Sequence, residues 1–282
     1  MSRVNRPPEG NARMDAEIYE LYAIKYAHHH RMARENFIGG DIHDGPMPID
    51  YFVWVVVGGG RTIVVDTGFD RTMATKRGRS IVRPVEEGLA RIGVDPLRVE
   101  DVVLTHLHYD HAGNHDLFPT ARFHVQEREM AFCTGRCMCH PEVRHPFAAE
   151  DVKAMVDRLF EDRVRFRETT DTLYPGITLH RVGGHSDGLQ IVRVRTARGW
   201  VVLASDAAHF YANIGRRLAY PIVYNVGDMF EGYRTVRHLA ESEDHIVPGH
   251  DPQVLAIYPP ASADVAGWIA RVDLPPTASP TY

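Results

Sequence analysis

The sequence predicts an α/β (α+β) protein in which two β-sheets pack together and helices cover their outer faces. The order of the elements carries this prediction, because strands, a helix and a strand are followed by more strands, a second helix and a final strand. Two sheets with helices outside them would bury the apolar side of each element. No low-complexity segment divides the 282 residues, which favours one domain.

The two ends of the chain differ from the middle in composition. We expect residues 1–15 to form a disordered polar lead, residues 16–258 to form the domain and residues 259–282 to form a Pro-rich tail. Hydrophobic residues make up 44% of the chain and charged residues 24%, as in an ordinary globular protein. The middle of the chain therefore has enough apolar material for a sizeable core.

Runs of β-branched and alternating apolar residues predict the strands of the first half. These strands are expected at residues 16–27, 51–57, 62–65, 99–104 and 122–125. The glycines at residues 58–60 would turn one strand back on the next. Residues 28–50 are rich in Gly and Pro and are expected to be a loop. A helix is expected at residues 85–92, after Pro84 and before Gly93.

The second half repeats this arrangement of strands and helices. Apolar residues at helical spacing predict helices at residues 148–160 and 229–240. Strands are expected at residues 177–182, 190–195, 200–204 and 245–247.

The composition argues against several classes of protein. The formal net charge is −5, a poor basis for binding nucleic acid. No run approaches the roughly 18 apolar residues of a membrane span, and the first residues lack the apolar core of a secretory signal. We therefore expect a cytoplasmic protein with neither a nucleic-acid nor a membrane partner.

The segment at residues 105–111, THLHYDH, concentrates metal-binding side chains directly after a buried strand. In an extended loop His106, His108 and Asp110 would point the same way, whereas His111 would face a neighbouring position. Neutral imidazoles and carboxylates are the donors that bind borderline cations such as Zn²⁺. The spacing therefore indicates two neighbouring subsites for metal.

The segment HLHYDHAGN at residues 106–114 resembles the HxHxDH signature of the metallo-β-lactamase superfamily. Four further segments resemble motifs of that family in the same order along the chain: Asp66-Thr67-Gly68, Gly184-His185-Ser186, Ser205-Asp206-Ala207 and Gly249-His250-Asp251. The resemblance implies an αββα sandwich of two mixed β-sheets flanked by helices, with two metal ions at the edge of the sheets.

The resemblance also implies a set of metal ligands. One ion would be bound by His106, His108 and His185, the other by Asp110, His111 and His250, and Asp206 would bridge both. Asp66 is expected to hold a ligand in place. The implied cofactors are two Zn²⁺ ions per chain, although Fe, Mn or Co suit the same donors.

Within the superfamily the chain looks most similar to the N-acyl homoserine lactonase and pyridoxolactonase branch. Its length, Asp206 and the segment at residues 205–213 carry that likeness. It implies a hydrolase that opens the ester bond of a small-molecule lactone, with a metal-bridging hydroxide as nucleophile and quorum quenching as the outcome for homoserine lactones. A glyoxalase II-like thioester hydrolase or another carboxylic ester hydrolase is the alternative. A homodimer is the commonest assembly for such a chain.

One position departs from the lactonase pattern. That branch has Tyr three residues after the bridging aspartate, where this chain has His209. We expect either His209 or Tyr211 to stabilise the oxyanion, and Asp110 to pass a proton to the leaving oxygen.

Two further segments invite interpretation. Residues 71–83 contain five basic residues and no acid, which is typical of a solvated loop. Because they follow the Asp66 turn, they could also cover the site and attract an anionic substrate. Cys133, Cys137 and Cys139 fit no structural zinc pattern and are expected to be free thiols in a segment that lines the substrate pocket.

Overall fold

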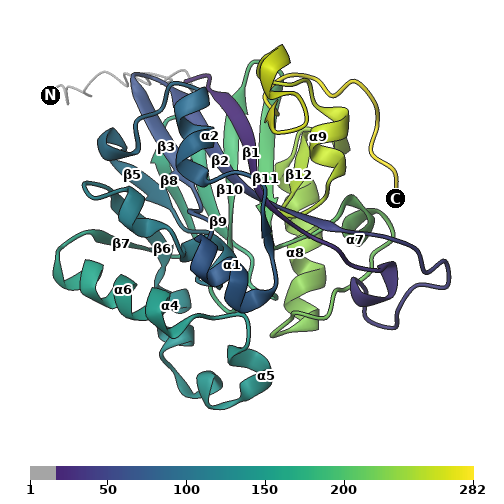
Figure 1. Ribbon diagram of the computed structural model, residues 1–282, viewed down its shortest axis with the longest axis horizontal. Helices are drawn as coiled ribbons and strands as arrows, with labels where there is room; N and C mark the ends of the chain where they lie inside the picture. Colours follow the sequence, from purple (N-terminus) through teal and green to yellow (C-terminus); the bar gives the residue numbers. More distant parts are fainter. Residues whose placement is uncertain (1–16) are drawn as a thin grey trace, which may run out of the picture.

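The computed structural model describes residues 17–282 and shows two mixed β-sheets packed face to face, with helices on both outer faces (Figure 1). This arrangement confirms the predicted fold class. The strands occupy the middle of the view, with α4 and α6 at the left and α8 at the right. The expected N-terminal lead at residues 1–15 lies outside the described residues.

The first sheet has the strand order β13-β1-β2-β3-β5-β6-β7, and β4 pairs with β1. Its strands are β1 (Glu20–His29), β2 (Ile49–Gly58), β3 (Arg61–Val65), β4 (Ser80–Ile81), β5 (Asp101–Val103), β6 (Arg122–Gln126), β7 (Val164–Arg167) and β13 (Ile269–Arg271). The pairs from β13 to β3 are antiparallel, and the pairs from β3 to β7 are parallel.

The second sheet has the strand order β12-β11-β10-β9-β8. Its strands are β8 (Thr170–Tyr174), β9 (Ile177–Arg181), β10 (Gln190–Thr196), β11 (Gly199–Ser205) and β12 (Ile246–Pro248). Only the β11–β12 pair is parallel.

The helices cover the outer faces of both sheets and connect their strands. The α-helices are α1 (Arg71–Arg77), α2 (Val85–Arg91), α3 (Tyr109–Ala112), α4 (Glu127–Cys133), α5 (Pro141–Arg144), α6 (Ala149–Phe160), α7 (Tyr211–Gly215), α8 (Val226–Leu239) and α9 (Gln253–Ile257).

The apolar side chains form three layers of core, because successive residues of a strand point to opposite faces of the sheet. On β10, Val192 and Val194 enter the core between the sheets, whereas Ile191 enters the core beneath α8. On β11, Leu203 packs between the sheets and Val202 packs outward. A third cluster joins the outer face of the first sheet to α2 and α6. Both sheets are therefore buried on both faces.

The strands and the longer helices that the sequence predicts lie within a few residues of their expected positions, whereas strands β4, β7, β8 and β13 are not among the expected strands. The basic segment after Asp66 differs, because it begins as helix α1 rather than as a loop. The Asp70 side chain accepts a hydrogen bond from the Met73 backbone N–H at 2.7 Å and so caps the helix start. Gly78 ends the helix at a φ of 64°, a backbone conformation that favours glycine.

The C-terminal segment at residues 259–282, expected to be a tail, contributes a strand to the first sheet. Strand β13 pairs with β1 through Ile269, Ala270 and Arg271. Further on, Thr277 donates from its backbone N–H to the Ile257 carbonyl at 2.7 Å. The segment covers the edge of β1 that would otherwise be left unpaired.

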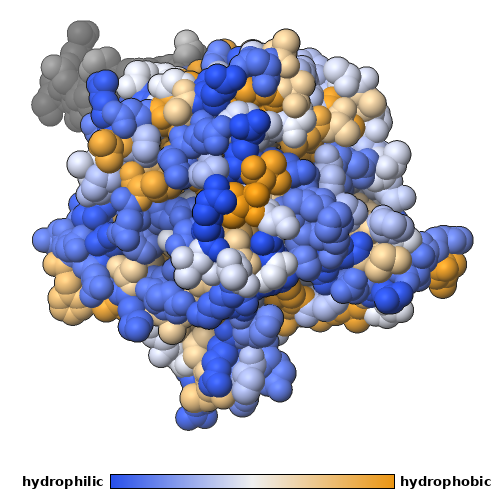
Figure 2. All heavy atoms as spheres, in the orientation of Figure 1, coloured by the Kyte–Doolittle hydropathy of each residue, from blue (hydrophilic) through white to orange (hydrophobic). Residues whose placement is uncertain are grey.

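The described part of the chain contains no helix that is long and apolar enough to cross a membrane. Figure 2 shows a face that is mostly hydrophilic, with hydrophobic residues in small groups. The expected cytoplasmic location and the expected homodimer stay predictions.

The fold brings the ends of several strands together at one edge of the sandwich. Asp66 follows β3, and the segment at residues 105–111 follows β5. Asp206 follows β11, and His250 follows β12. His185 lies in the connection from β9 to β10. Residues far apart in sequence therefore meet at one place.

Asp101 at the start of β5 links the two sheets. Its buried carboxylate accepts hydrogen bonds from His124 at 2.7 Å, from Tyr174 of the other sheet at 2.6 Å and from Arg122 at 2.9 Å. Burial by itself would raise the pKa of this carboxyl, but the three donors lower it well below its usual range.

We expect Asp101→Asn to lower the free energy of unfolding by about 2–4 kcal/mol at pH 7, since it breaks buried hydrogen bonds to a charge. The carboxyl pKa is lower in the folded chain than in the unfolded chain. Its contribution is therefore fully present above the unfolded pKa of about 4 and is lost as the pH falls further. Urea unfolding at pH 7 and pH 3.5 measures both effects. Glu100→Gln, at an exposed position, is the control. An equal loss of unfolding free energy in the two variants would contradict the stabilising role of Asp101.

Candidate metal centre

Five of the seven residues predicted as metal ligands come from loops that follow strands, and the other two, Asp110 and His111, belong to the short helix α3. All seven are buried. Groups of three with ligand atoms within 4.8 Å of one another are His106–His108–His185, His106–His111–Asp206, Asp110–His111–His250 and His185–Asp206–His209. The structure thus brings the predicted ligand set together.

The first group consists of three imidazoles that face one another. The Nε2 atoms of His106 and His185 are 3.1 Å apart. The His108 ring lies at 4.4 Å from the His106 ring and at 4.5 Å from the His185 ring, measured between centroids. Such a cluster of nitrogen lone pairs suits a borderline divalent cation.

The second group combines a carboxylate with two imidazoles. Nε2 of His111 lies 3.5 Å from Oδ2 of Asp110, and Nε2 of His250 lies 3.7 Å from the same oxygen. Its metal-binding atoms are one carboxylate oxygen and two imidazole nitrogens, whereas the first group has three imidazole nitrogens. The two groups therefore differ in charge.

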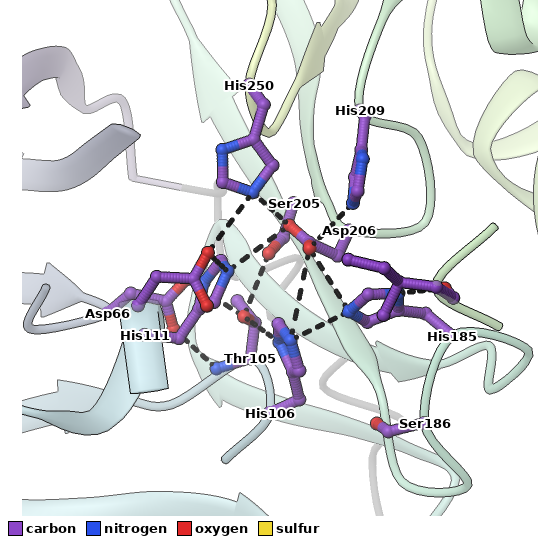
Figure 3. Close-up of polar contacts among 12 residues, drawn as sticks. Asp66, Thr105, His106, His111, His185, Ser186, Ser205, Asp206, His209 and His250 are labelled. Atoms are coloured by element: carbon purple, nitrogen blue, oxygen red, sulfur yellow. Dashed lines mark hydrogen bonds and ion pairs between the residues drawn. The ribbon is translucent and has the colours of Figure 1, made fainter. Parts of the chain in front are cut away.

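Asp206 lies between the two groups, as Figure 3 shows. Its Oδ1 is 3.3 Å from Nε2 of His111 and 3.0 Å from Nε2 of His250. Its Oδ2 is 3.2 Å from Nε2 of His185 and 4.0 Å from Nε2 of His106. One carboxylate therefore presents one oxygen to each group.

The outer nitrogen of three imidazoles is held by a hydrogen bond. Nδ1 of His111 contacts Oδ2 of Asp66 at 2.8 Å. Nδ1 of His185 donates to the Ile222 carbonyl at 2.7 Å, and Nδ1 of His250 donates to the Asp50 carbonyl at 2.8 Å. These bonds fix the tautomer and leave each Nε2 free to bind a metal ion, as in known metal sites.

The residues present fit a pair of cations. Within the described chain, Nε2 of His111 and Oδ1 of Asp206 are buried with no hydrogen-bond partner. Burial lowers the pKa of His106, and the imidazoles around it lower that pKa further. Burial also opposes the charged form of His111, but Asp206, Asp110 and Asp66 outweigh it and raise the His111 pKa. A cation would satisfy these unpartnered atoms and neutralise the carboxylates.

Asp66 joins the second group to the strand ends. It accepts from the Thr105 backbone N–H at 2.7 Å and from the Thr105 hydroxyl at 2.8 Å, besides contacting His111. Asp66 and Ser205 have φ values of 61° and 44°, which are uncommon for residues other than glycine. Such strained turns concentrate at functional sites, where neighbouring contacts hold them.

Glu129 is a buried carboxylate that sequence reasoning missed. Its Oε1 accepts from the Leu107 backbone N–H at 2.9 Å. Its Oε2 accepts from the Ser186 hydroxyl at 2.7 Å and from the Gly188 backbone N–H at 3.0 Å. Burial raises the pKa of this carboxyl, while the three donors favour its charged form. Glu129 thus ties the loop of His106 and His108 to the loop of His185.

His209 lies beside Asp206 and is held there from two sides. Its Nε2 is 2.9 Å from Oδ2 of Asp206. Its ring stacks on Tyr220 with 3.8 Å between centroids, and the Tyr220 hydroxyl donates to the Asp206 carbonyl. Burial lowers the His209 pKa to about 3, so the ring is neutral and its Nε2–H donates to Asp206. Nothing in the sequence distinguished Tyr220 as the residue that stacks here.

Tyr211, the alternative to His209 in the sequence-based expectation, has its hydroxyl outside the ligand cluster. Its side chain packs in the core between the sheets with Val247 and Val254. The hydroxyl is buried without a hydrogen-bond partner in the described chain. Tyr211 is the first residue of helix α7. Of the two alternatives, only His209 lies at the centre.

A cavity of about 520 Å³ adjoins the first group of imidazoles. His108 and His185 form part of its wall, and Phe132, Phe147 and Tyr224 supply aromatic surface. An apolar cavity beside a few polar groups is the usual form of a small-molecule site. Cys133, Cys137 and Cys139 lie in the neighbouring segment and are free thiols.

We expect Glu129→Gln to weaken metal binding by about 10–100-fold, because the amide places a donor opposite N–H groups and loosens both ligand loops. Titration of the metal-free protein with Zn²⁺ measures the affinity. Glu127→Gln on the exposed face of the same helix should bind metal like the unaltered protein. Equal affinity in the two variants would refute the positioning role.

Known proteins with similar sequences include two kinds of hydrolase. The chain is 32% identical over 185 residues to the N-acyl homoserine lactonase AiiB of Agrobacterium fabrum, an alignment that covers 60% of this chain and 63% of the relative. It is 25% identical over 224 residues to the probable metallo-hydrolase Mb2322c of Mycobacterium bovis, covering 69% of each. The chain thus matches less than two thirds of the length of the lactonase.

Solved structures show the same fold. A quorum-quenching N-acyl homoserine lactone lactonase superposes with a TM-score of 0.68 at 21% identity, covering 84% of this chain and 94% of the other. A probable metal-dependent hydrolase from Staphylococcus aureus gives a TM-score of 0.70 at 14% identity, covering 94% and 97%. The family model of the metallo-beta-lactamase superfamily matches residues 48–255, which include every residue of the cluster. The chain therefore belongs to the metallo-β-lactamase superfamily.

Proposed function

We propose that this chain is a dinuclear metal-dependent hydrolase that opens the ester bond of a small-molecule lactone, either an N-acyl homoserine lactone or a related compound. The observation that carries the proposal is the position of Asp206 between two groups of ligands, next to an apolar cavity. The similarity to a lactonase of Agrobacterium fabrum supports the choice of a lactone.

The two groups define which residues would hold the cations. His106, His108 and His185 would hold one ion, Asp110, His111 and His250 would hold the other, and Asp206 would contribute to both. Zn²⁺ is the first expectation, and Fe, Mn or Co suit the same nitrogen and oxygen donors. When bound, such a pair of cations polarises a carbonyl oxygen and lowers the pKa of water toward neutrality.

Residues of the chain would orient the substrate and transfer the proton of the attacking water. The aromatic wall formed by Phe132, Phe147 and Tyr224 would bind the apolar substituent and exclude water from it. The ester carbonyl would then lie near His108 and His185, which line the same cavity.

Asp110 would transfer the proton, and His209 would position another side chain of the site. The Asp110 carboxylate would accept a proton from the attacking water and return it to the leaving oxygen. His209 donates its Nε2–H to Asp206 and so holds that carboxylate between the two groups. We therefore assign His209 a positioning role.

A screen of the Zn²⁺-loaded protein tests the substrate class. We expect release of acid from N-acyl homoserine lactones or other small lactones, with about two metal ions per chain. A glutathione thioester is the comparison, because a glyoxalase II-like hydrolase would use the same ligands. Turnover of the thioester without any lactone would overturn the lactonase proposal.

The paired change His106→Ala and His108→Ala is expected to remove metal loading and turnover together, because it deletes two of three ligands in one group. Elemental analysis and the acid-release assay on the same sample measure both. The exposed His238→Ala on α8 is the matched control and should retain both properties. Full turnover in the paired variant would rule out the proposed centre.

A further inference from the structure

Within residues 17–282, three arginines that form no ion pair with a carboxylate lie on the side of the second ligand group. Arg77 ends helix α1, and Arg79 follows two residues later. Arg31 lies just beyond strand β1, in the segment that leads to β2. Figure 1 shows α1 near the centre of the face viewed, in front of the strands. All three side chains are partly buried.

Arg79 is connected to the ligand cluster through two tyrosines. Its Nε donates to the Tyr109 hydroxyl at 3.0 Å, and Nη1 contacts Nε2 of His29 at 3.1 Å. The hydroxyls of Tyr109 and Tyr51 are 3.3 Å apart. The Tyr51 ring packs edge-on against the ring of His250 at 5.1 Å between centroids. The guanidinium is therefore linked to the second group through Tyr109 and Tyr51.

The two flanking arginines are also held by uncharged groups. Arg77 lies over the Tyr109 ring, 4.6 Å from its centroid, and donates to the backbone carbonyls of His145 and Phe147. Arg31 donates from Nη2 to the backbone carbonyl of Glu35. The Glu35 carboxylate is engaged by the Met32 backbone N–H at 2.7 Å.

The positive charge of this cluster is not neutralised within residues 17–282. Neighbouring cations are paired, since Lys76 contacts Glu150 and Arg83 contacts Glu87. Arg31, Arg77 and Arg79 form no ion pair with a carboxylate of the described chain. The Asp110 carboxylate, next to Tyr109 in sequence, is directed at His111 and His250. Partly buried cations without a partner are costly unless a ligand neutralises them.

The free donors of the cluster suit a planar anion. No hydrogen bond to another described residue uses Nη2 of Arg79, or Nε and Nη1 of Arg31. Arginine forks match the geometry of a carboxylate and bind it with two parallel hydrogen bonds. The apolar cavity adjoins His108 and His185, in the other ligand group. The cavity thus adjoins the first group, whereas the arginine cluster contacts the second group through Tyr109 and Tyr51.

Building on the proposed lactonase function, we propose that the substrate carries a carboxylate besides its scissile ester, and that Arg79 and Arg31 bind this carboxylate. The selected substrate is then an anionic lactone. Increasing salt would weaken the preference for the anionic lactone, because part of the arginine cluster is exposed to solvent.

The test compares two lactones that differ only in charge. A γ-butyrolactone with a carboxymethyl substituent and its primary amide are assayed with the Zn²⁺-loaded full chain. We expect kcat/KM to be about tenfold or more higher for the acid, since a charge-assisted hydrogen-bond pair is lost with the amide. Arg79→Met should reduce the ratio of kcat/KM for the acid to kcat/KM for the amide to about one. Arg71→Met, an exposed position at the start of helix α1, is the control and should keep the preference.

The outcomes separate this proposal from the proposed function. Equal kcat/KM for acid and amide in the unaltered protein would overturn the carboxylate site and leave the hydrolase standing. If neither lactone is hydrolysed, the proposed lactonase function is wrong. Calorimetry of ligand binding then tests the carboxylate site separately. Glutarate should then bind about tenfold more tightly than its monoamide, and Arg79→Met should abolish the difference. Equal binding would overturn the site. Arg31→Met provides a second variant if melting temperature shows that Arg79→Met is unfolded.

Discussion

The carboxylate of Asp206 is the group on which the rest of the site depends. It is buried at the meeting point of five imidazoles, four of which approach within 3.3 Å and the fifth, His106, within 4.0 Å. Burial alone would raise its pKa, but His250, His111 and the other imidazoles lower it well below the ordinary value. A charged carboxylate at this depth requires cationic neighbours. Under the proposed function, two bound cations would meet that requirement, and Asp206 would contribute to holding both.

The fold provides this arrangement by ending its strands at one edge. Parallel pairing of β3 with β5 and of β11 with β12 brings three ligand-bearing segments and Asp66 to the same end of the sandwich. The unusual backbone at Asp66 and Ser205 turns the chain sharply at two of those ends. Glu129 then fixes the separation of two ligand loops through backbone and hydroxyl hydrogen bonds. Rigid support of this kind keeps ligands in place when metal leaves.

Much of the fold and the ligand set could be predicted from sequence because each has a local signal. Strands such as Ile49–Gly58 are long β-branched runs, and the ligands lie in short motifs directly after strands. Strand β13 has only three residues, so its pairing with β1 depends on contacts distant in sequence. The start of helix α7 decides that Tyr211 points into the core, whereas Tyr220, nine residues later, packs on His209. The buried Glu129 and the exposed Glu127 share one helical turn, and only tertiary contacts distinguish them.

The central claim is that Asp206 separates two cation positions. A crystal structure of the protein purified with Zn²⁺, with an anomalous difference map recorded at the zinc edge, tests this claim most directly. The account predicts two peaks, one enclosed by His106, His108 and His185 and the other by Asp110, His111 and His250, with one Asp206 oxygen directed at each. A single peak, or peaks that do not contact Asp206, would contradict it.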